Sequence, residues 1–189
     1  MTAPSRSIHY VGPAAEIWED PDVGVAMETI PAISIAQPWA SWIALGWKSI
    51  ETRSHGNFAG LVGKRIAIHA SKTWDRESLD VADVFMTPEQ IQAHGRLTAA
   101  KWYPQGELVA VARVLRMQPC NHVALGRAAL CWYEGGVGYV LGDVSPLPRG
   151  IRVSGLQGIF YVDLPTIWAE QLPLPLFGPP AVAAEEVPA

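Results

Sequence analysis

The stretch from Ile33 to Ser71 constrains the fold more than any other part of the chain. Two short apolar runs, Ile33–Ile35 and Arg65–His69, flank a compact segment rich in polar and aromatic residues. The first run is β-branched and apolar, so we expect a buried strand there. A segment that must supply core strands and still carries so many polar and aromatic groups is typical of a pocket rather than of a plain core.

A short helix is predicted directly after the first strand. Pro38 suits the first helical position, where its missing N–H costs nothing. Trp39, Trp42 and Ile43 then share one helical face. Gly46 suits the left-handed conformation that ends such a helix.

Two strands are expected to present polar side chains on one face each. In Ser49–Arg53 the alternation puts Glu51 and Arg53 on the face opposite the apolar residues, whereas it leaves the face of the preceding lysine open. In Arg65–His69 the same period puts Ala67 and His69 on the face opposite the isoleucines. The glycine-rich loop 55–60 between these strands is placed to rim the pocket.

Three pieces of this stretch form a longer pattern: Gln-Pro-Trp-Ala, then Gly-x-Lys-x-x-Glu-x-Arg, then a strand ending His-x-Ser. Its residues are Gln37, Pro38, Trp39, Ala40, Gly46, Lys48, Glu51, Arg53, His69 and Ser71. The pattern resembles the ASCH domain, the activating-signal-cointegrator homology module of the PUA-like superfamily. Gly106–Val114, Gly138–Pro148 and Gly155–Asp163 fit it too, so the resemblance covers Ile30 to Leu164. The combined pattern is more specific than any one piece.

The resemblance implies an α+β fold, a PUA-like small β-barrel with flanking helices. The remaining sequence agrees with short strands and intervening helices. Glu107–Met117 predicts a central strand, and Gly138–Val144 and Gln157–Leu164 predict the closing strands. One helix is expected after Thr73. Another is expected to open at Thr87, where Gln90 completes a capping box, and to end at Gly95. The segment 121–134 permits a broken helix.

Charge and proline content divide the chain into three parts. Residues 1–29 hold one base and five acids, residues 164–189 hold three acids and no base, and residues 30–163 hold 13 bases and 10 acids. We interpret 1–29 as an N-terminal arm, 30–164 as the domain and 165–189 as a proline-rich tail, with both acidic termini flexible. The small basic excess in 48–76 suits one nucleotide or a short single strand better than a long duplex.

Composition argues against several other classes of protein. No apolar run approaches the roughly 18–20 residues needed to span a bilayer, so no membrane partner is expected. The first residues lack the pattern of a signal peptide, so we expect a cytoplasmic protein. Cys120 and Cys131 are eleven residues apart without a CxxC motif, which favours free thiols and offers no metal site. We expect no metal and no cofactor.

The resemblance also implies site residues. In ASCH-like proteins the positions of Lys48, Glu51 and Arg53 line the cleft, and some members are amidohydrolases on acylated cytidine or ribonucleases. This implies acid/base roles for Lys48 and Glu51. In the amidohydrolases a threonine nucleophile stands where this chain has Glu51, and a carboxylate replaces a hydroxyl nucleophile poorly. A solvated strand with a lysine–glutamate pair is the alternative.

Ligand contacts are expected from Gln37, Trp39, Arg53, His69 and Ser71. Each has a second interpretation. Arg53 either binds a phosphate or holds Glu51 in place. Gln37 either pairs with a base edge or binds backbone at the helix start, and Trp39 either stacks on a base or packs in the core. His69 and Ser71 form either a nucleophile pair or, more simply, a hydrogen-bonded structural histidine beside an unrelated serine.

The tail carries a second motif, QLPLPLF. It resembles the short motif by which bacterial proteins bind the DNA-polymerase sliding clamp, and its residues are Gln171, Leu172, Leu174, Leu176 and Phe177. An extended peptide of this kind presents leucines and an aromatic ring to apolar pockets. The alternative is that the tail packs on its own domain.

Three functions therefore stay open. The first is an ASCH module that binds nucleic acid, RNA in particular, or a nucleotide. The second is a hydrolase that acts through the same cleft on a modified nucleobase or nucleoside of the acylated-cytidine type, or on RNA. The third is an adaptor associated with the DNA sliding clamp through the tail.

Overall fold

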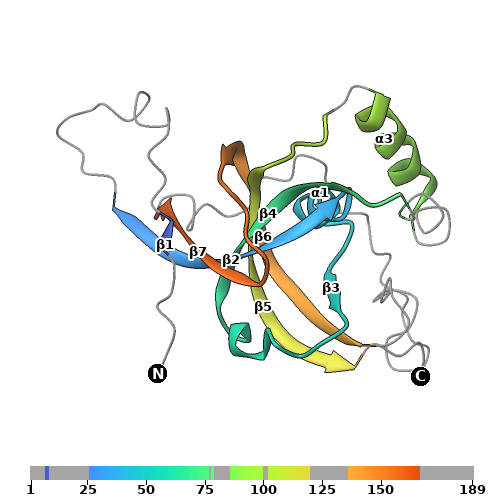
Figure 1. Cartoon of the computed structure of the whole chain (residues 1–189). Helices are drawn as coiled ribbons and strands as arrows, with labels where there is room; N and C mark the ends of the chain where they lie inside the picture. Colours follow the sequence, from blue (N-terminus) through green and yellow to red (C-terminus); the bar gives the residue numbers. More distant parts are fainter. Residues whose placement is uncertain are drawn as a thin grey trace, which may run out of the picture.

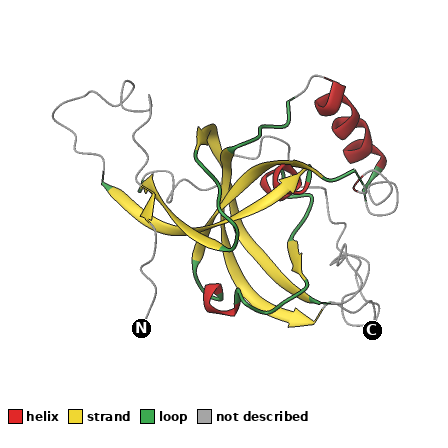
Figure 2. Ribbon diagram, in the orientation of Figure 1, coloured by secondary structure: helices red, strands yellow, loops and turns green. Residues whose placement is uncertain are grey.

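The computed structural model describes residues 7–8, 26–76, 78, 86–99, 102–119 and 136–166. Its strands are β1 (Ser7–Ile8), β2 (Met27–Gln37), β3 (Ile50–Arg53), β4 (Arg65–Trp74), β5 (Glu107–Pro119), β6 (Val137–Arg152) and β7 (Ile159–Pro165). The helices are α1 (Trp39–Ala44), the short 3-10 helix η2 (Ala59–Leu61) and α3 (Pro88–Ala99). Strands make up most of this part of the chain, and the helices lie around them (Figure 2).

The strands form one mixed sheet of seven strands in the order β1-β7-β2-β4-β5-β6-β3. The pairs β1–β7 and β2–β4 are parallel, and the other neighbours are antiparallel. The sheet curves strongly, so that its strands cross one another in Figure 1. Within the described residues β1 and β3 are its two edges, and no strand pairing joins them. The predicted combination of strands with flanking helices is thus confirmed, and the described part of the fold is mostly β with a mixed sheet.

Alternation along the strands builds two apolar clusters. On β4, Ile66 and Ile68 enter one cluster with the helix α1, and Ala67 enters the other, where Phe160 of β7 packs. The predicted orientations of the isoleucines and of Ala67 are confirmed, because successive side chains of a strand point to opposite faces. The predicted helix after the first strand is also present, and Gly46 adopts a φ of 73° at its end.

Three sequence predictions need correction. The helix that opens at Thr87 does not end at Gly95 but continues to Ala99 as α3. Thr98 Oγ1 donates to the carbonyl of His94, 2.9 Å away. This hydrogen bond links the residues before and after Gly95 within the same helix. The strand predicted to end at Val144 continues to Arg152, since bulges absorb its irregular register against β5. The strand predicted from Gln157 begins at Ile159.

Several other predictions fall outside the described residues. These are the broken helix in 121–134, most of the helix after Thr73, both cysteines and the whole clamp-like motif Gln171–Phe177. In the segment 1–29 the described residues are Ser7, Ile8 and residues 26–29, and β1 and the start of β2 belong to the sheet.

Candidate functional site

The start of β3 assembles a chain of charged side chains, which we call the Lys48–Glu51–Arg53 chain. Lys48 Nζ lies 3.0 Å from Glu51 Oε2, and Arg53 Nε lies 3.1 Å from Glu51 Oε1. Glu51 and Arg53 share a face because side chains alternate along a strand. The glycine-ended turn after α1 then brings Lys48 to the same side, where its backbone N–H bonds to the carbonyl of Trp42 at 3.1 Å.

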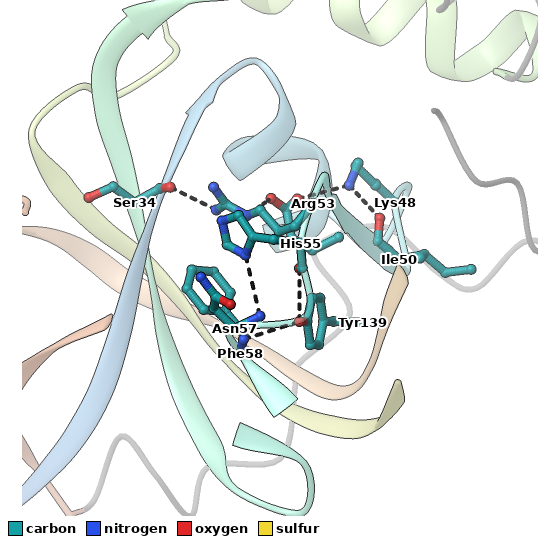
Figure 3. Close-up of polar contacts among 9 residues, drawn as sticks. Ser34, Lys48, Ile50, Arg53, His55, Asn57, Phe58 and Tyr139 are labelled. Atoms are coloured by element: carbon teal, nitrogen blue, oxygen red, sulfur yellow. Dashed lines mark hydrogen bonds and ion pairs between the residues drawn. The ribbon is translucent and has the colours of Figure 1, made fainter. Parts of the chain in front are cut away.

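Burial increases along this chain from Arg53 to Lys48. The side chains of Lys48, Glu51 and Arg53 are 3%, 8% and 26% exposed. Burial lowers the pKa of Lys48 below its ordinary value, and the nearby Glu51 carboxylate opposes that shift. Lys48 Nζ also donates to the carbonyl of Ile50 (Figure 3). The lysine is therefore held deep in the structure, while the arginine reaches solvent.

Arg53 connects the edge strand β3 to β2. Its Nη2 donates to the carbonyl of Ser34, 3.0 Å away (Figure 3). Its Nε forms an ion pair with Glu51 Oε1 at 3.1 Å. The Nε–H is not directed at that oxygen, so the contact is not a hydrogen bond. The guanidinium lies over the ring of Phe58 at 5.1 Å, a cation–π arrangement. These contacts fix the direction of a partly exposed positive charge.

A cleft of about 490 Å³ opens beside Arg53. One wall comes from the end of β3 and the following loop, and the other from the start of β7. The lining residues are Arg53, His55, Asn57, Phe58, Gln157, Gly158 and Ile159. The pairing of β2 with β7 runs from Met27 to Ile33, so the cleft lies where this pairing stops and β3 approaches β2 instead.

Tyr139 of β6 holds the loop wall of the cleft. Its hydroxyl accepts a hydrogen bond from the backbone N–H of Phe58 at 3.1 Å and donates to the carbonyl of His55 at 3.3 Å. His55 Nδ1 accepts a hydrogen bond from the backbone N–H of Asn57 at 3.3 Å. The ring of His55 stands edge-on to Phe58 at 5.6 Å. The wall is therefore ordered by its own contacts (Figure 3).

Two predicted ligand contacts lie elsewhere. The side chain of Gln37 is fully buried: its Nε2 donates to Ser41 Oγ at 2.9 Å and to the carbonyl of Pro104 at 2.5 Å. Its Oε1 accepts from the backbone N–H of Ser41 at 3.2 Å, so it binds backbone at the helix start. Trp39 is half-buried, and its Nε1 donates to Asp75 Oδ2 at 2.7 Å. Neither side chain lines the cleft.

His69 and Ser71 do not pair with each other. His69 Nδ1 lies 3.0 Å from Ser34 Oγ, whereas Ser71 Oγ accepts from the backbone N–H of Thr73 at 3.2 Å. His69 is buried, with its ring edge-on to Phe160, and burial lowers its pKa. Neither residue lines the cleft, and the arrangement is that of a hydrogen-bonded structural histidine.

Other residues at the cleft were not identified from the sequence as site residues. The glycine-rich loop was expected to rim a pocket, and His55, Asn57 and Phe58 do so. Ser34, Tyr139 and Gln157 were missed because they lie far from this loop in sequence. The only local signal was the glutamine–glycine pair at Gln157, a turn dipeptide at the start of the strand predicted over Gln157–Leu164.

Neither a metal site nor a membrane helix is evident in the part of the chain that the structure describes. No group of three or more His, Cys, Asp or Glu side chains there is placed to hold a metal ion. No helix there is long and apolar enough to cross a membrane.

The chain matches no family model and no curated protein sequence. Among solved structures it matches ASCH from Zymomonas mobilis, with 15% identity and a TM-score of 0.43 over 69% of this chain and 85% of that one. A serine-to-alanine variant of that protein matches with 17% identity and a TM-score of 0.44 over 69% and 86% of the two chains. A tyrosine-to-phenylalanine variant matches with 15% and 0.43 over 69% and 88%.

Proposed function

We propose that this chain binds a nucleotide, or a nucleotide unit of single-stranded RNA, in the cleft between β3 and the start of β7. The observation that supports this most directly is the guanidinium of Arg53. It is held by Ser34, lies over Phe58 and stays 26% exposed at the cleft. A guanidinium fixed in this way is suited to a phosphate oxygen or to the face of a base.

The other lining groups suit the rest of a nucleotide. Asn57 and Gln157 place amide side chains on opposite walls, and each amide offers both a donor and an acceptor to a base edge. His55 adds an exposed imidazole on which a base can stack. The cleft volume of about 490 Å³ lies within the range of roughly 300–1,000 Å³ typical of small-ligand sites.

Binding is favoured over hydrolysis by the positions of Lys48 and Glu51. Both side chains are more than nine-tenths buried behind Arg53, and they are paired with each other. A general base must come within hydrogen-bond reach of the proton that it removes. In this arrangement Lys48 and Glu51 support Arg53 and do not contact a ligand. A hydrolase that acts on acylated cytidine or RNA is therefore the second candidate function.

We also propose that the curved sheet closes into a PUA-like barrel and that it does so at this cleft. The hydrogen bond from Arg53 to the carbonyl of Ser34 joins the edge strand β3 to β2. That contact supports a seam at which the edge strand β3 meets β2, just beyond the point where β2 stops pairing with β7. Ligand sites are common at the open mouths of small barrels.

The test is a binding panel with the full-length protein. Its members are nucleoside 5′-monophosphates, acetylated cytidine, and RNA and DNA single strands of about eight nucleotides, the range of one small β-barrel site. We expect Arg53→Ala to weaken binding about tenfold or more, the effect of losing a charge-assisted hydrogen bond. Chromatography of the same samples reports any product.

Arg113→Ala is the matched control. Arg113 lies on β5, pairs with Asp143 at 3.1 Å and does not line the cleft, yet its loss changes the net charge by the same amount. Equal weakening by both substitutions would indicate general electrostatic attraction and contradict the proposed site. Failure of every panel member to bind would overturn the function, and turnover lost on Lys48→Ala would favour the hydrolase instead.

A further inference from the structure

Ser34 of β2 contacts both walls of the cleft. Its backbone carbonyl accepts the hydrogen bond from Arg53 Nη2 at 3.0 Å. Its hydroxyl donates to the carbonyl of Leu156, also 3.0 Å away. Arg53 belongs to one wall, and Leu156 directly precedes Gln157, the first lining residue of the other wall. Ser34 therefore forms a hydrogen bond to each side of the cleft.

His69 is a second hydrogen-bond partner of the Ser34 hydroxyl. Ser34 and His69 are partners in the parallel register of β2 and β4, which places His69 Nδ1 3.0 Å from Ser34 Oγ. A serine hydroxyl has a single hydrogen to donate. If that hydrogen goes to Leu156, Ser34 Oγ can only accept from His69, and the imidazole must carry its hydrogen on Nδ1. If the hydrogen goes to His69 instead, the carbonyl of Leu156 loses its donor.

The surroundings of His69 favour the first arrangement. The ring is 3% exposed, and its Nε2 forms no well-aligned hydrogen bond among the described residues, although the backbone of Val153 lies close enough to raise the pKa of the ring. A hydrogen on Nε2 would therefore be a buried donor without a well-aligned acceptor. With the hydrogen on Nδ1, the donor is satisfied by Ser34 and only a lone pair of Nε2 is left unpaired.

The loop backbone lies directly on this pair. A Cβ added to Gly155 would come within 2.1 Å of His69 Cε1 and 2.8 Å of Ser34 Oγ. Only a glycine leaves space for such an approach. The loop that carries Leu156 and Gln157 is thus seated on Ser34 and His69 by close contact as well as by the hydrogen bond.

We propose that Ser34 is the positioning residue of the cleft and that His69 orients its hydroxyl, so that nucleotide fit depends on this buried pair. The proposal rests on the function proposed above, but neither side chain contacts the ligand. Ser34 acts through Arg53 on one wall and through Leu156 on the other.

The first experiment measures the ring tautomer of His69 by ¹⁵N NMR in the full-length protein without ligand. We expect the Nδ1–H form at neutral pH, which is the less common form of a free histidine. Conversion of His69 to the Nε2–H form in Ser34→Ala would support the proposal further. An Nε2–H tautomer in the unmodified protein would overturn it, whether or not any nucleotide binds.

The second experiment compares Ser34→Ala, Ser34→Thr and Ser49→Ala. Loss of one hydrogen bond corresponds to about 0.5–1.5 kcal/mol, so we expect Ser34→Ala to weaken binding of the best panel member about 3- to 10-fold. Ser34→Thr keeps the hydroxyl and should restore most of the affinity. Ser49 is exposed and outside the cleft, so Ser49→Ala should bind normally. Unchanged binding by Ser34→Ala would overturn the proposal.

Two further measurements cover the remaining outcomes. If Ser34→Ala does not fold, His69→Asn and His69→Leu replace it. An asparagine amide near the position of Nδ1 can still donate to Ser34, so binding should survive in His69→Asn and fall in His69→Leu. If the unmodified protein binds no nucleotide, the rate of backbone amide exchange at residues 154–158 tests the positioning role of Ser34 instead. Faster exchange in Ser34→Ala than in Ser49→Ala supports the positioning role, and equal exchange overturns it.

Discussion

At the residue scale, the buried ion pair of Lys48 and Glu51 is the feature of the site with the largest desolvation cost. A buried ammonium is costly unless a partner offsets its desolvation, and burial lowers the pKa of Lys48 for this reason. Glu51 supplies that partner and at the same time borders Arg53. One carboxylate thereby supports both the buried and the exposed cation.

Glu51→Gln should therefore destabilise the protein strongly. Removing one member of a buried ion pair leaves the other charge uncompensated, and we expect the free energy of unfolding to fall by about 3–5 kcal/mol in urea denaturation. Glu28→Gln is the matched control. Glu28 is 40% exposed in its pair with Arg65, so its change should cost less than about 1 kcal/mol. Equal effects of the two substitutions would contradict this account.

At the element scale, α3 and the cleft loop show how local contacts place larger parts of the chain. The capping box predicted at the start of α3 is confirmed: the backbone N–H of Thr87 donates to Gln90 Oε1 at 2.9 Å, and that of Gln90 to Thr87 Oγ1 at 3.2 Å. His94 Nδ1 on α3 lies 2.5 Å from the hydroxyl of Tyr103. This contact anchors the helix directly before Gly95.

Thr87→Ala should weaken α3 at its start. Loss of a helix cap costs about 0.5–2 kcal/mol, and faster amide exchange should be confined to the first turns of α3. Thr73→Ala, an exposed change near the end of β4, is the control and should leave that exchange unaltered. Unchanged exchange in Thr87→Ala would show that tertiary contacts alone hold the helix.

Gly155→Ala should displace the cleft loop. The added methyl group would overlap the ring of His69, and overpacking of this kind costs about 1–3 kcal/mol. We expect lower thermal stability together with weaker nucleotide binding. Gly60→Ala is the comparison, because a Cβ at Gly60 meets nothing within 4 Å. Normal binding by Gly155→Ala would mean that the loop can shift without changing the cleft.

At the scale of the whole molecule, the chain has a net charge of −4, although residues 30–163 hold an excess of bases. The cleft itself contains one arginine and no lysine among its lining residues. Binding should therefore depend little on long-range attraction to a polyanion.

The salt dependence of RNA binding tests this expectation. Each phosphate contact on a single strand contributes a slope of about −0.7 to a plot of log K against log salt concentration. With Arg53 as the cation of the cleft, we expect a slope between about −0.7 and −1.4. A slope several times steeper, measured by fluorescence anisotropy, would indicate a broad basic surface instead.

Acid should destabilise the fold through two buried histidines. Burial lowers the pKa values of His69 and His94 below the ordinary value of 6.5. Below that pH the unfolded chain binds more protons than the native one, so the free energy of unfolding falls as the pH drops through 6.5. Urea denaturation between about pH 8 and about pH 5 should show this loss, and His69→Asn should reduce it. A pH-independent stability would contradict the burial of neutral rings.

Much of the local structure was predictable from the sequence. Period-two alternation placed Glu51 with Arg53 and separated Ile66 from Ala67, because side-chain direction in a strand depends only on parity. The glycine-rich loop 55–60 was correctly expected at the rim of a pocket. For Gln37 and His69 the sequence left two interpretations open, since a side chain's partners depend on which backbone lies opposite it.

The amino-acid sequence alone determined the short helix after β2, the spacing of Lys48, Glu51 and Arg53, and the cap of α3, because all of these depend on residues a few positions apart. Only the tertiary structure decided that Ser34 joins Arg53 to Leu156, which lies 122 residues further along the chain than Ser34. Such contacts follow from the register between distant strands and from the place where β7 stops pairing with β2. No local periodicity encodes that register, so the second wall of the cleft became visible only in the folded chain.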